Sequence, residues 1–274
     1  MSRLPALHGE SQRVSFHQLS REVGITILAI LTLIAFGVGF FIFLVICFRR
    51  SPYNVVQTLV SWVNVCFTRI LWRVEVKGQI PARAAVGGVL VCNHRASIDP
   101  VFIQLVAHRI IHWFVAREYF KLPLVGGFLR ISESIPTNRA GIDTASTKTA
   151  IRLAREGHWI GMLPEGRINK TDAFLLPGRP GAALIALKAE VPVVPCYLEG
   201  VPYDGTFWGC LFMPGRVRLV IGEPIDLSPY YGREREHEVL RKVTLLFLRR
   251  IAELGGRPDF QPEIAGRRWL PSSE

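Results

Sequence analysis

The 274-residue sequence lacks the short motifs that identify several classes of enzyme. It has no glycine-rich phosphate-binding loop, no cluster of side chains with the spacing of metal ligands, and no nucleophile elbow around a serine. Nothing in the chain therefore favours a metal ion or a cofactor, and we predict neither.

Cysteine is scarce, and its spacing shows none of the pairs expected for zinc ligands or redox dithiols. We predict reduced thiols in a cytosolic domain, mostly as small buried side chains. The five positions are Cys47, Cys66, Cys92, Cys196 and Cys210.

Charge is absent from one long stretch near the N-terminus, residues 23–48. As an α-helix this stretch is about 39 Å long, enough to cross a hydrocarbon core of about 30 Å. A cleaved signal peptide has a shorter apolar stretch followed by small residues, whereas this one runs into Arg49 and Arg50. We predict a retained membrane helix, with a buried core helix as the alternative. The two arginines favour a cytoplasmic location for the rest of the chain.

A second apolar segment, residues 53–72, is interrupted by Gln57, Ser61, Asn64 and Arg69. Polar residues at intervals of three to five predict an amphipathic helix that lies in the membrane interface or re-enters it. The sequence leaves open whether the two helices form a hairpin in one leaflet or one span followed by a surface helix. We assign 23–72 to a membrane anchor, preceded by a cytoplasmic or flexible segment, 1–22.

Positive charge is in excess. Lys and Arg number 33 against 22 Asp and Glu, so the net charge of +11 will attract anionic partners such as nucleic acid, acidic lipid or phosphorylated metabolites. A hydrophobic fraction of 49% favours contact with lipid. The basic residues are dispersed and match no nucleic-acid readout motif. We therefore predict a lipid bilayer as a partner, and no nucleic acid.

After Gly78, short apolar runs alternate with helical stretches, a pattern typical of α/β domains. We predict a mixed, mostly parallel sheet flanked by helices over 73–258, followed by a C-terminal tail, 259–274. The predicted strands are 72–76, 89–92, 112–115, 133–136, 159–163, 193–198 and 217–221. The predicted helices are 100–107, 122–131, 144–156, 181–189 and 233–254, the last amphipathic and packed on the domain or in contact with the membrane.

The connection between the strand 89–92 and the helix at Pro100 contains His94 and Asp99. Such connections often carry functional residues. Asp99 is placed either to cap the helix or to bond a ring nitrogen of His94, which leaves the other nitrogen to take a proton from an alcohol. The spacing alone leaves both alternatives open.

The segment Asn93-His94-Arg95-Ala96-Ser97-Ile98-Asp99 resembles the NHxxxxD motif of the glycerolipid acyltransferases, the 1-acyl-glycerol-3-phosphate acyltransferase family. Residues 112–118 resemble the segment that follows this motif, and 134–139 resemble the second motif. Residues 163–166 (Leu-Pro-Glu-Gly) and 191–195 (Val-Pro-Val-Val-Pro) resemble the third and fourth. The matches keep the family's order from about residue 89 to 200.

This resemblance implies a membrane-associated O-acyltransferase of phospholipid synthesis. The expected acyl donor is acyl-CoA or acyl-carrier-protein, and the expected acceptor is a lysophospholipid, foremost 1-acyl-glycerol 3-phosphate. In this interpretation His94 is the catalytic base and Asp99 orients it. Arg139 binds the acceptor phosphate. The remaining expected substrate-binding residues are Asn93, Arg117, Glu165, Gly166 and Arg167.

The third motif departs from the family, which usually has Gly-Thr-Arg-Ser where this chain has Gly166-Arg167-Ile168-Asn169. The guanidinium comes one place early, so glycerol 3-phosphate, another lysophospholipid or a lyso-aminolipid remain alternative acceptors. Glu165 either bonds an acceptor hydroxyl, orients an arginine, or braces the loop. A non-catalytic, lipid-binding membrane adaptor is the rival hypothesis from another class.

Overall fold

The computed structural model describes residues 10–81, 87–138, 143–206 and 209–266. The chain divides into two compact units, Met1–Asn54 and Val55–Glu274. The sequence-based boundary between anchor and domain lies after residue 72, whereas the units divide after Asn54. The second predicted anchor helix therefore belongs to the unit that contains the sheet.

The first unit contains α1 (Glu10–Arg50), which ends on the basic pair Arg49 and Arg50. Cations in the last turn interact favourably with the helix dipole. Residues Leu19–Arg50 contain an 18-residue stretch with a mean hydropathy of 2.9, and the large apolar side chains of this stretch are mostly exposed. Among the described residues this is the one helix long and apolar enough to cross a membrane, so the predicted apolar helix over 23–48 is confirmed as a helix and is longer than expected.

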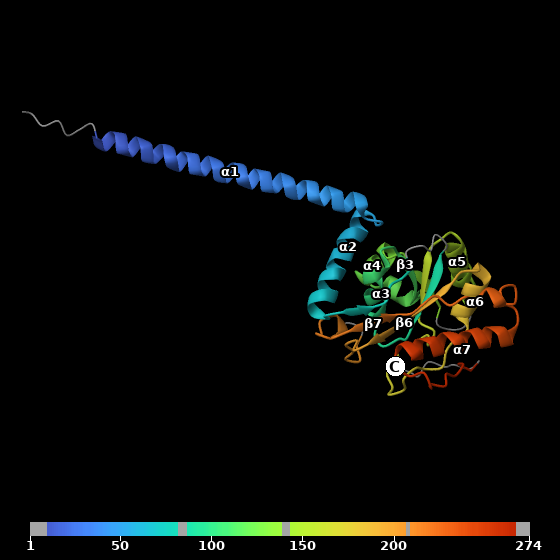
Figure 1. The fold of residues 1–274 in the computed structure, drawn as a ribbon. Coiled ribbons are helices and arrows are strands. Elements are labelled where there is room, and N and C mark those ends of the chain that lie inside the picture. Colours follow the sequence, from blue (N-terminus) through green and yellow to red (C-terminus); the bar gives the residue numbers. More distant parts are fainter. Residues whose placement is uncertain (1–9, 82–86, 139–142, 207–208, 267–274) are drawn as a thin grey trace, which may run out of the picture. The chain divides into compact units, whose positions relative to one another are not determined.

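Seven strands in the described part of the second unit form one sheet, in the order β1-β7-β6-β2-β5-β3-β4 (Figure 1). Neighbouring strands run parallel except β6 and β7, which are antiparallel. This confirms the predicted mixed, mostly parallel sheet. The strands are β1 (Glu75–Lys77), β2 (Gly88–Cys92), β3 (Ile111–Ala116), β4 (Ile135–Thr137), β5 (Trp159–Met162), β6 (Val193–Glu199) and β7 (Arg218–Ile221).

The helices of this unit follow the prediction with two differences. The predicted helix 122–131 starts later, as α4 at Val125, because Leu124 has a positive φ of 62° after Pro123; a 3-10 turn, Arg117–Lys121, precedes it. The predicted helix 233–254 begins later, since Glu236 has an extended backbone. The helices are α2 (Val55–Cys66), α3 (Asp99–Ala107), α4 (Val125–Ile131), α5 (Thr144–Arg155), α6 (Gly181–Ala189) and α7 (His237–Leu254).

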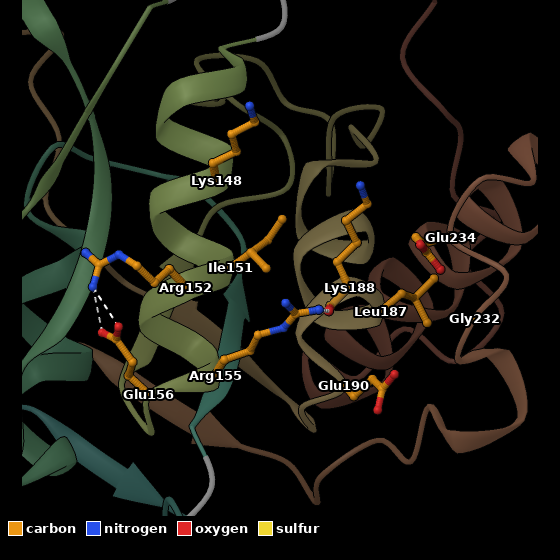
Figure 2. Close-up of a pocket in the computed structure, with 10 residues that line it drawn as sticks. All are labelled: Lys148, Ile151, Arg152, Arg155, Glu156, Leu187, Lys188, Glu190, Gly232 and Glu234. Carbon is orange, nitrogen blue, oxygen red and sulfur yellow. Dashed lines mark hydrogen bonds and ion pairs between the residues drawn. The ribbon is translucent and has the colours of Figure 1, made fainter.

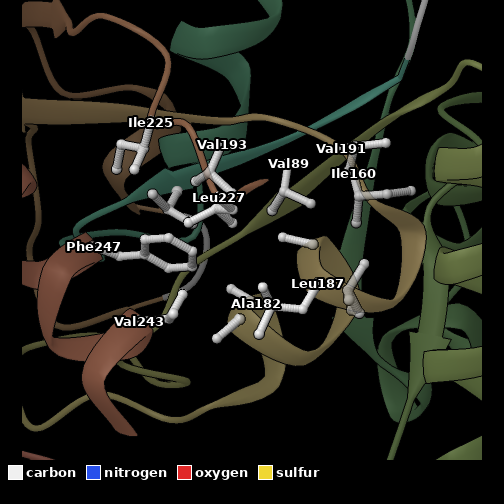
Figure 3. Close-up of a cluster of buried hydrophobic side chains, with 14 of the residues drawn as sticks. Val89, Ile160, Ala182, Leu187, Val191, Val193, Ile225, Leu227, Val243 and Phe247 are labelled. Atoms are coloured by element: carbon white, nitrogen blue, oxygen red, sulfur yellow. The ribbon is translucent and has the colours of Figure 1, made fainter. Parts of the chain in front are cut away.

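The core lies on both faces of the sheet, and this requires central strands that are apolar throughout. Every residue of β2 is buried. Val89 and Val91 belong to a cluster with α5, α6 and α7, whereas Leu90 and Cys92 belong to a cluster with α3. Figure 3 shows the first cluster, in which Phe247 of α7 lies close to the strand residues. The apolar stripe predicted for the last helix therefore packs on the domain.

A surface helix of a water-soluble domain buries its apolar side and exposes its polar side. The helix α2 does the reverse. Its buried side chain is Thr58, and Thr68 is buried in the π-helical turn that follows, Phe67–Leu71. Gln57 Nε2 donates to Ile131 O (2.9 Å) and Asn64 Nδ2 donates to Val101 O (3.0 Å). The exposed large side chains are Val55, Val56, Leu59, Trp62, Val63, Val65, Phe67 and Ile70. The amphipathic helix is thus present, with its polar side on the domain.

Candidate active site

The candidate site lies at the carboxyl ends of three neighbouring strands, where ligands usually bind in open α/β sheets. β2 is paired on one side with β6, through Cys92 and Cys196, and on the other with β5, through Val91 and Met162. The loops that follow β2 and β5 therefore start at the same edge of the sheet. This brings the first and third predicted motifs together.

His94 and Asp99 are in contact, as the catalytic interpretation requires. The distance from His94 Nδ1 to Asp99 Oδ2 is 2.8 Å. A carboxylate acceptor places the proton on Nδ1, so Nε2 has a free lone pair. The His94 side chain is 16% exposed and its Nε2 makes no hydrogen bond to any residue that the structure describes. The ring is therefore positioned to accept a proton from an incoming group.

Asp99 is the first residue of α3 rather than its cap, which is Ile98. Its Oδ2 also accepts hydrogen bonds from the backbone N–H groups of Arg95 (2.6 Å) and Ala96 (3.0 Å). The side chain is fully buried. Asp99 therefore does not cap the helix. Its carboxylate binds the histidine and the backbone of the loop that contains it.

Asn93 holds the start of this loop to β6. Its Nδ2 donates to Leu198 O (2.9 Å), and its Oδ1 accepts from Leu198 N (2.7 Å). The side chain is buried. The expected substrate contact of Asn93 has no support in this geometry, because its amide already binds the main chain.

Glu165 connects the loop after β5 to the backbone of the histidine. Its Oε1 accepts from His94 N (2.7 Å) and its Oε2 from Leu176 N (2.7 Å). Burial raises the pKa of Glu165, and these two hydrogen bonds oppose that rise. Of the three roles considered for Glu165, bracing the loop is the one that these contacts fit.

Two further residues hold the same loop, and sequence reasoning assigned them no role. Asn169 is buried, and its backbone N–H donates to His94 O (2.8 Å). Arg95 donates from Nη2 to Phe174 O (3.2 Å) and Ala173 O (3.3 Å). Arg95 belongs to the first matched motif and Asn169 comes shortly after the third, so their place in the sequence was the available signal. The consequence is a histidine whose backbone is fixed by side chains and main chain of the facing loop.

Of the three predicted phosphate-binding arginines, the structure describes Arg117 and Arg167. Arg117 follows β3 and lies 3.8 Å from Asp143, at the start of α5. Asp143 caps that helix, and hydrogen bonds from backbone amides, with a smaller effect of Arg117, lower its pKa. Arg139 lies outside the described residues. Arg167 and Gly166 lie in the loop after β5, and Gly166 has a φ of 70°, a conformation that favours glycine.

The buried thiols near the site are poor nucleophiles. Cys92 and Cys196 are completely buried, and burial raises the pKa of Cys196 to about 12 and raises that of Cys92. All five cysteines are free, as predicted, although Cys66 on α2 is exposed. Within the described part of the chain, no three His, Cys, Asp or Glu side chains are grouped so that they could bind a metal ion.

A cavity of about 630 Å³ lies elsewhere, between α5 and α6 (Figure 2). One of its cations is neutralised, because Arg152 pairs with Glu156 (2.7 Å), and Arg155 donates to the backbone oxygen of Lys188 (2.6 Å). None of the predicted site residues lines it. It is therefore separate from the histidine site.

A family model, curated relatives and a solved structure were all found to be similar to this chain. The Acyltransferase family model matches residues 73–199. A 1-acyl-sn-glycerol-3-phosphate acyltransferase of Bacillus subtilis is 30% identical over 187 residues, 67% of this chain and 87% of the relative. The human 1-acyl-sn-glycerol-3-phosphate acyltransferase beta is 28% identical over 67% of this chain and 68% of its own. The crystal structure of the 1-acyl-sn-glycerophosphate acyltransferase of Thermotoga maritima is similar, with a TM-score of 0.57 and 25% identity over 74% of this chain and 80% of that chain.

Proposed function

Because this chain belongs to the 1-acyl-sn-glycerol-3-phosphate acyltransferase family, and is therefore an O-acyltransferase, we propose that it acylates the free hydroxyl of 1-acyl-glycerol 3-phosphate at His94. The contact between His94 Nδ1 and Asp99 Oδ2, in a side chain that is 16% exposed, is the observation that carries this proposal. The names of the relatives supply the acceptor.

In the proposed reaction, the acceptor hydroxyl gives its proton to His94 Nε2 while its oxygen attacks the thioester carbonyl carbon. The tetrahedral intermediate then collapses, the carbon–sulfur bond breaks, and the imidazolium returns the proton to the leaving thiolate. Asp99 holds the Nδ1–H and stabilises the imidazolium. A thioester is already activated, so placing the alcohol and taking its proton supply the catalysis.

The acyl donor is acyl-CoA or acyl-carrier-protein, both of which present a thioester. We propose that Arg117, Arg139 and Arg167 bind the acceptor phosphate, since planar guanidinium groups make paired hydrogen bonds to phosphate oxygens. Glu165 and Asn93 act as positioning residues in this proposal, because each binds backbone at the edges of the histidine loop.

We also propose that the enzyme works at the cytoplasmic face of a membrane. Two observations support the membrane: the apolar length of α1 and the exposed apolar side of α2. Burying the exposed side of α2 in lipid removes apolar surface from water, worth about 25 cal/mol per Å². The acceptor could then reach His94 without leaving the bilayer. The basic pair at the end of α1 supports the cytoplasmic orientation.

The test is an acyl-transfer assay with purified protein in mixed micelles. The acceptors are 1-acyl-glycerol 3-phosphate, glycerol 3-phosphate, another lysophospholipid and a lyso-aminolipid, each with acyl-CoA and with acyl-carrier-protein. We expect the first acceptor to be preferred, and His94→Ala to abolish transfer while the protein still folds and binds vesicles. Preference for another acceptor would overturn the assignment.

One observation favours a different acceptor as the second candidate. Ile168 stands where the family usually has arginine, and Arg167 stands one place earlier. If the altered loop no longer favours a phosphate monoester, a lyso-aminolipid or another lysophospholipid would be the better substrate. A non-catalytic adaptor is a further alternative, and it predicts that His94→Ala leaves the cellular role intact.

A further inference from the structure

The loop after β5 carries a second arginine beside Arg167, and neither composition nor motif spacing pointed to it. Arg179 N donates to Pro164 O (2.8 Å), so the end of the loop runs beside its beginning. A Cβ atom built on Gly166 would lie 3.0 Å from Arg179 Cδ and 3.3 Å from its Nε. The Arg179 side chain therefore crosses directly over Gly166, where glycine leaves room for it.

This position is next to the residues that hold the catalytic histidine. Gly166 follows Glu165, whose carboxylate accepts from His94 N at 2.7 Å. The Arg179 side chain therefore packs over the turn whose Glu165 braces the catalytic loop. It is half-buried, and burial lowers its pKa.

Arg167 directly follows Gly166, the residue that the Arg179 side chain crosses, and its charge lowers the pKa of Arg179 further. An anion that binds beside two neighbouring guanidinium groups is attracted by both charges. A phosphate monoester matches such a pair, because each guanidinium offers a planar set of donors to its oxygens. Arg179 would also supply the guanidinium that the family's third motif places at the position of Ile168.

The C-terminal segment fixes the backbone just before Arg179. Gly178 N donates to Glu263 O (2.8 Å), and Ala265 N donates to Gly178 O (2.9 Å). Ile264 and Gly178 form a parallel bridge. The predicted tail from residue 259 is thus, over its described part, attached to the loop of the candidate site.

We propose that Arg179 and Arg167 together bind the phosphate of the acceptor, and that the pairing of Gly178 with Glu263–Ala265 holds Arg179 in position. This inference rests on the proposed function, since it adds Arg179 to the arginines that bind the acceptor's phosphate. It also explains how the chain can bind a phosphate despite its altered third motif.

The first test compares Arg179→Ala with Arg179→Lys and with the control Arg249→Ala, an exposed arginine on α7. The KM for 1-acyl-glycerol 3-phosphate and for the acyl donor is measured with full-length protein in mixed micelles. A charge-assisted hydrogen bond is worth about 10- to 100-fold in affinity. We expect Arg179→Ala to raise the acceptor KM by that factor and leave the donor KM unchanged, Arg179→Lys to recover part of the loss, and the control to behave as wild type.

A second acceptor separates phosphate binding from general damage. With monoacylglycerol of the same chain length, which has no phosphate, wild type and Arg179→Ala should differ little. The inference is overturned if Arg179→Ala keeps the wild-type acceptor KM, or if the KM values of acceptor and donor rise together. Failure of the proposed function looks different: wild-type enzyme itself would then show no preference for the phosphate-bearing acceptor.

The second test addresses the C-terminal segment. Ala265→Pro removes the N–H that donates to Gly178 O, whereas Ala265→Gly keeps it. We expect the proline variant to raise the acceptor KM toward that of Arg179→Ala, with the glycine variant unchanged. A chain ending at residue 262 should behave as the proline variant. A wild-type acceptor KM in both the proline variant and the shorter chain would refute the positioning role.

Discussion

Replacing Asp99 by asparagine separates the negative charge of this side chain from its place in the loop. All of its hydrogen bonds use Oδ2: those with His94 Nδ1, Arg95 N and Ala96 N. Oδ1 is buried and has no hydrogen-bond partner among the described residues. An asparagine can therefore place its carbonyl oxygen at the Oδ2 position and its NH2 group at the Oδ1 position without meeting another donor.

The expected result follows from what asparagine keeps and what it loses. The two backbone bonds survive, so thermal unfolding should stay near wild type. The charge that stabilises the imidazolium is lost, so kcat should fall by about 10²–10⁴, the usual contribution of positioned acid–base catalysis. By contrast, Asp99→Ala leaves two buried N–H groups without partners, at about 1–3 kcal/mol each, and should lower stability as well as activity.

The assay is release of the thiol from the acyl donor, followed at saturating acceptor, with thermal unfolding measured on the same preparations. His94→Ala is the reference for complete loss of the base. If Asp99→Asn keeps activity within about threefold of wild type, a barrier change below 1 kcal/mol, then the charge of Asp99 has no part in the reaction. A large loss of folded protein in Asp99→Asn would refute the hydrogen-bond argument instead.

Glu165→Gln turns an NH2 group toward one of two backbone donors, so we expect about tenfold lower activity with the fold retained. Burial raises the pKa of Glu165 in the folded state. The stability that this carboxyl group contributes is therefore complete below its unfolded-state pKa and is lost as the pH rises through its folded-state pKa. The unfolding free energy of wild type, compared with that of Glu165→Gln, should decrease from acid to neutral pH. Trp62 is 36% exposed on α2, so lipids with brominated acyl chains should quench its fluorescence, and Trp62→Phe should remove that quenching; no quenching would argue against lipid contact. Phe247→Ala should lower the unfolding free energy by about 3–5 kcal/mol, measured by urea denaturation, without changing the acceptor KM.

The sequence predicted the layers of the fold because apolar runs in β2, β5 and β6 are buried on both faces and so contain few polar residues. It also predicted α6 and the start of α5 to the residue. The late start of α4, at Val125 instead of residue 122, was missed, because it depends on the positive φ of Leu124, a conformation that leucine rarely adopts.

The candidate site was predicted in part. The contact of His94 and Asp99 follows from a short turn between adjacent elements, so local spacing was informative. Arg179 was missed because it approaches Gly166 only after the loop has folded back, and Glu263–Ala265 reach that loop from the far end of the chain. The buried roles of Asn93 and Glu165 depend on partners about 105 and 71 residues away, as their hydrogen bonds record, and no local pattern reports such contacts.

The apolar outer side of α2 has a practical consequence for the purification of this enzyme. Removing the N-terminal 54 residues would take away α1. The compact unit that remains would still begin with α2, whose outer side is apolar. Such a shortened protein should still need detergent, and in its absence should self-associate through that side. A freely water-soluble form would require polar substitutions along the outer side of α2, with Thr58, Asn64 and Thr68 left in place.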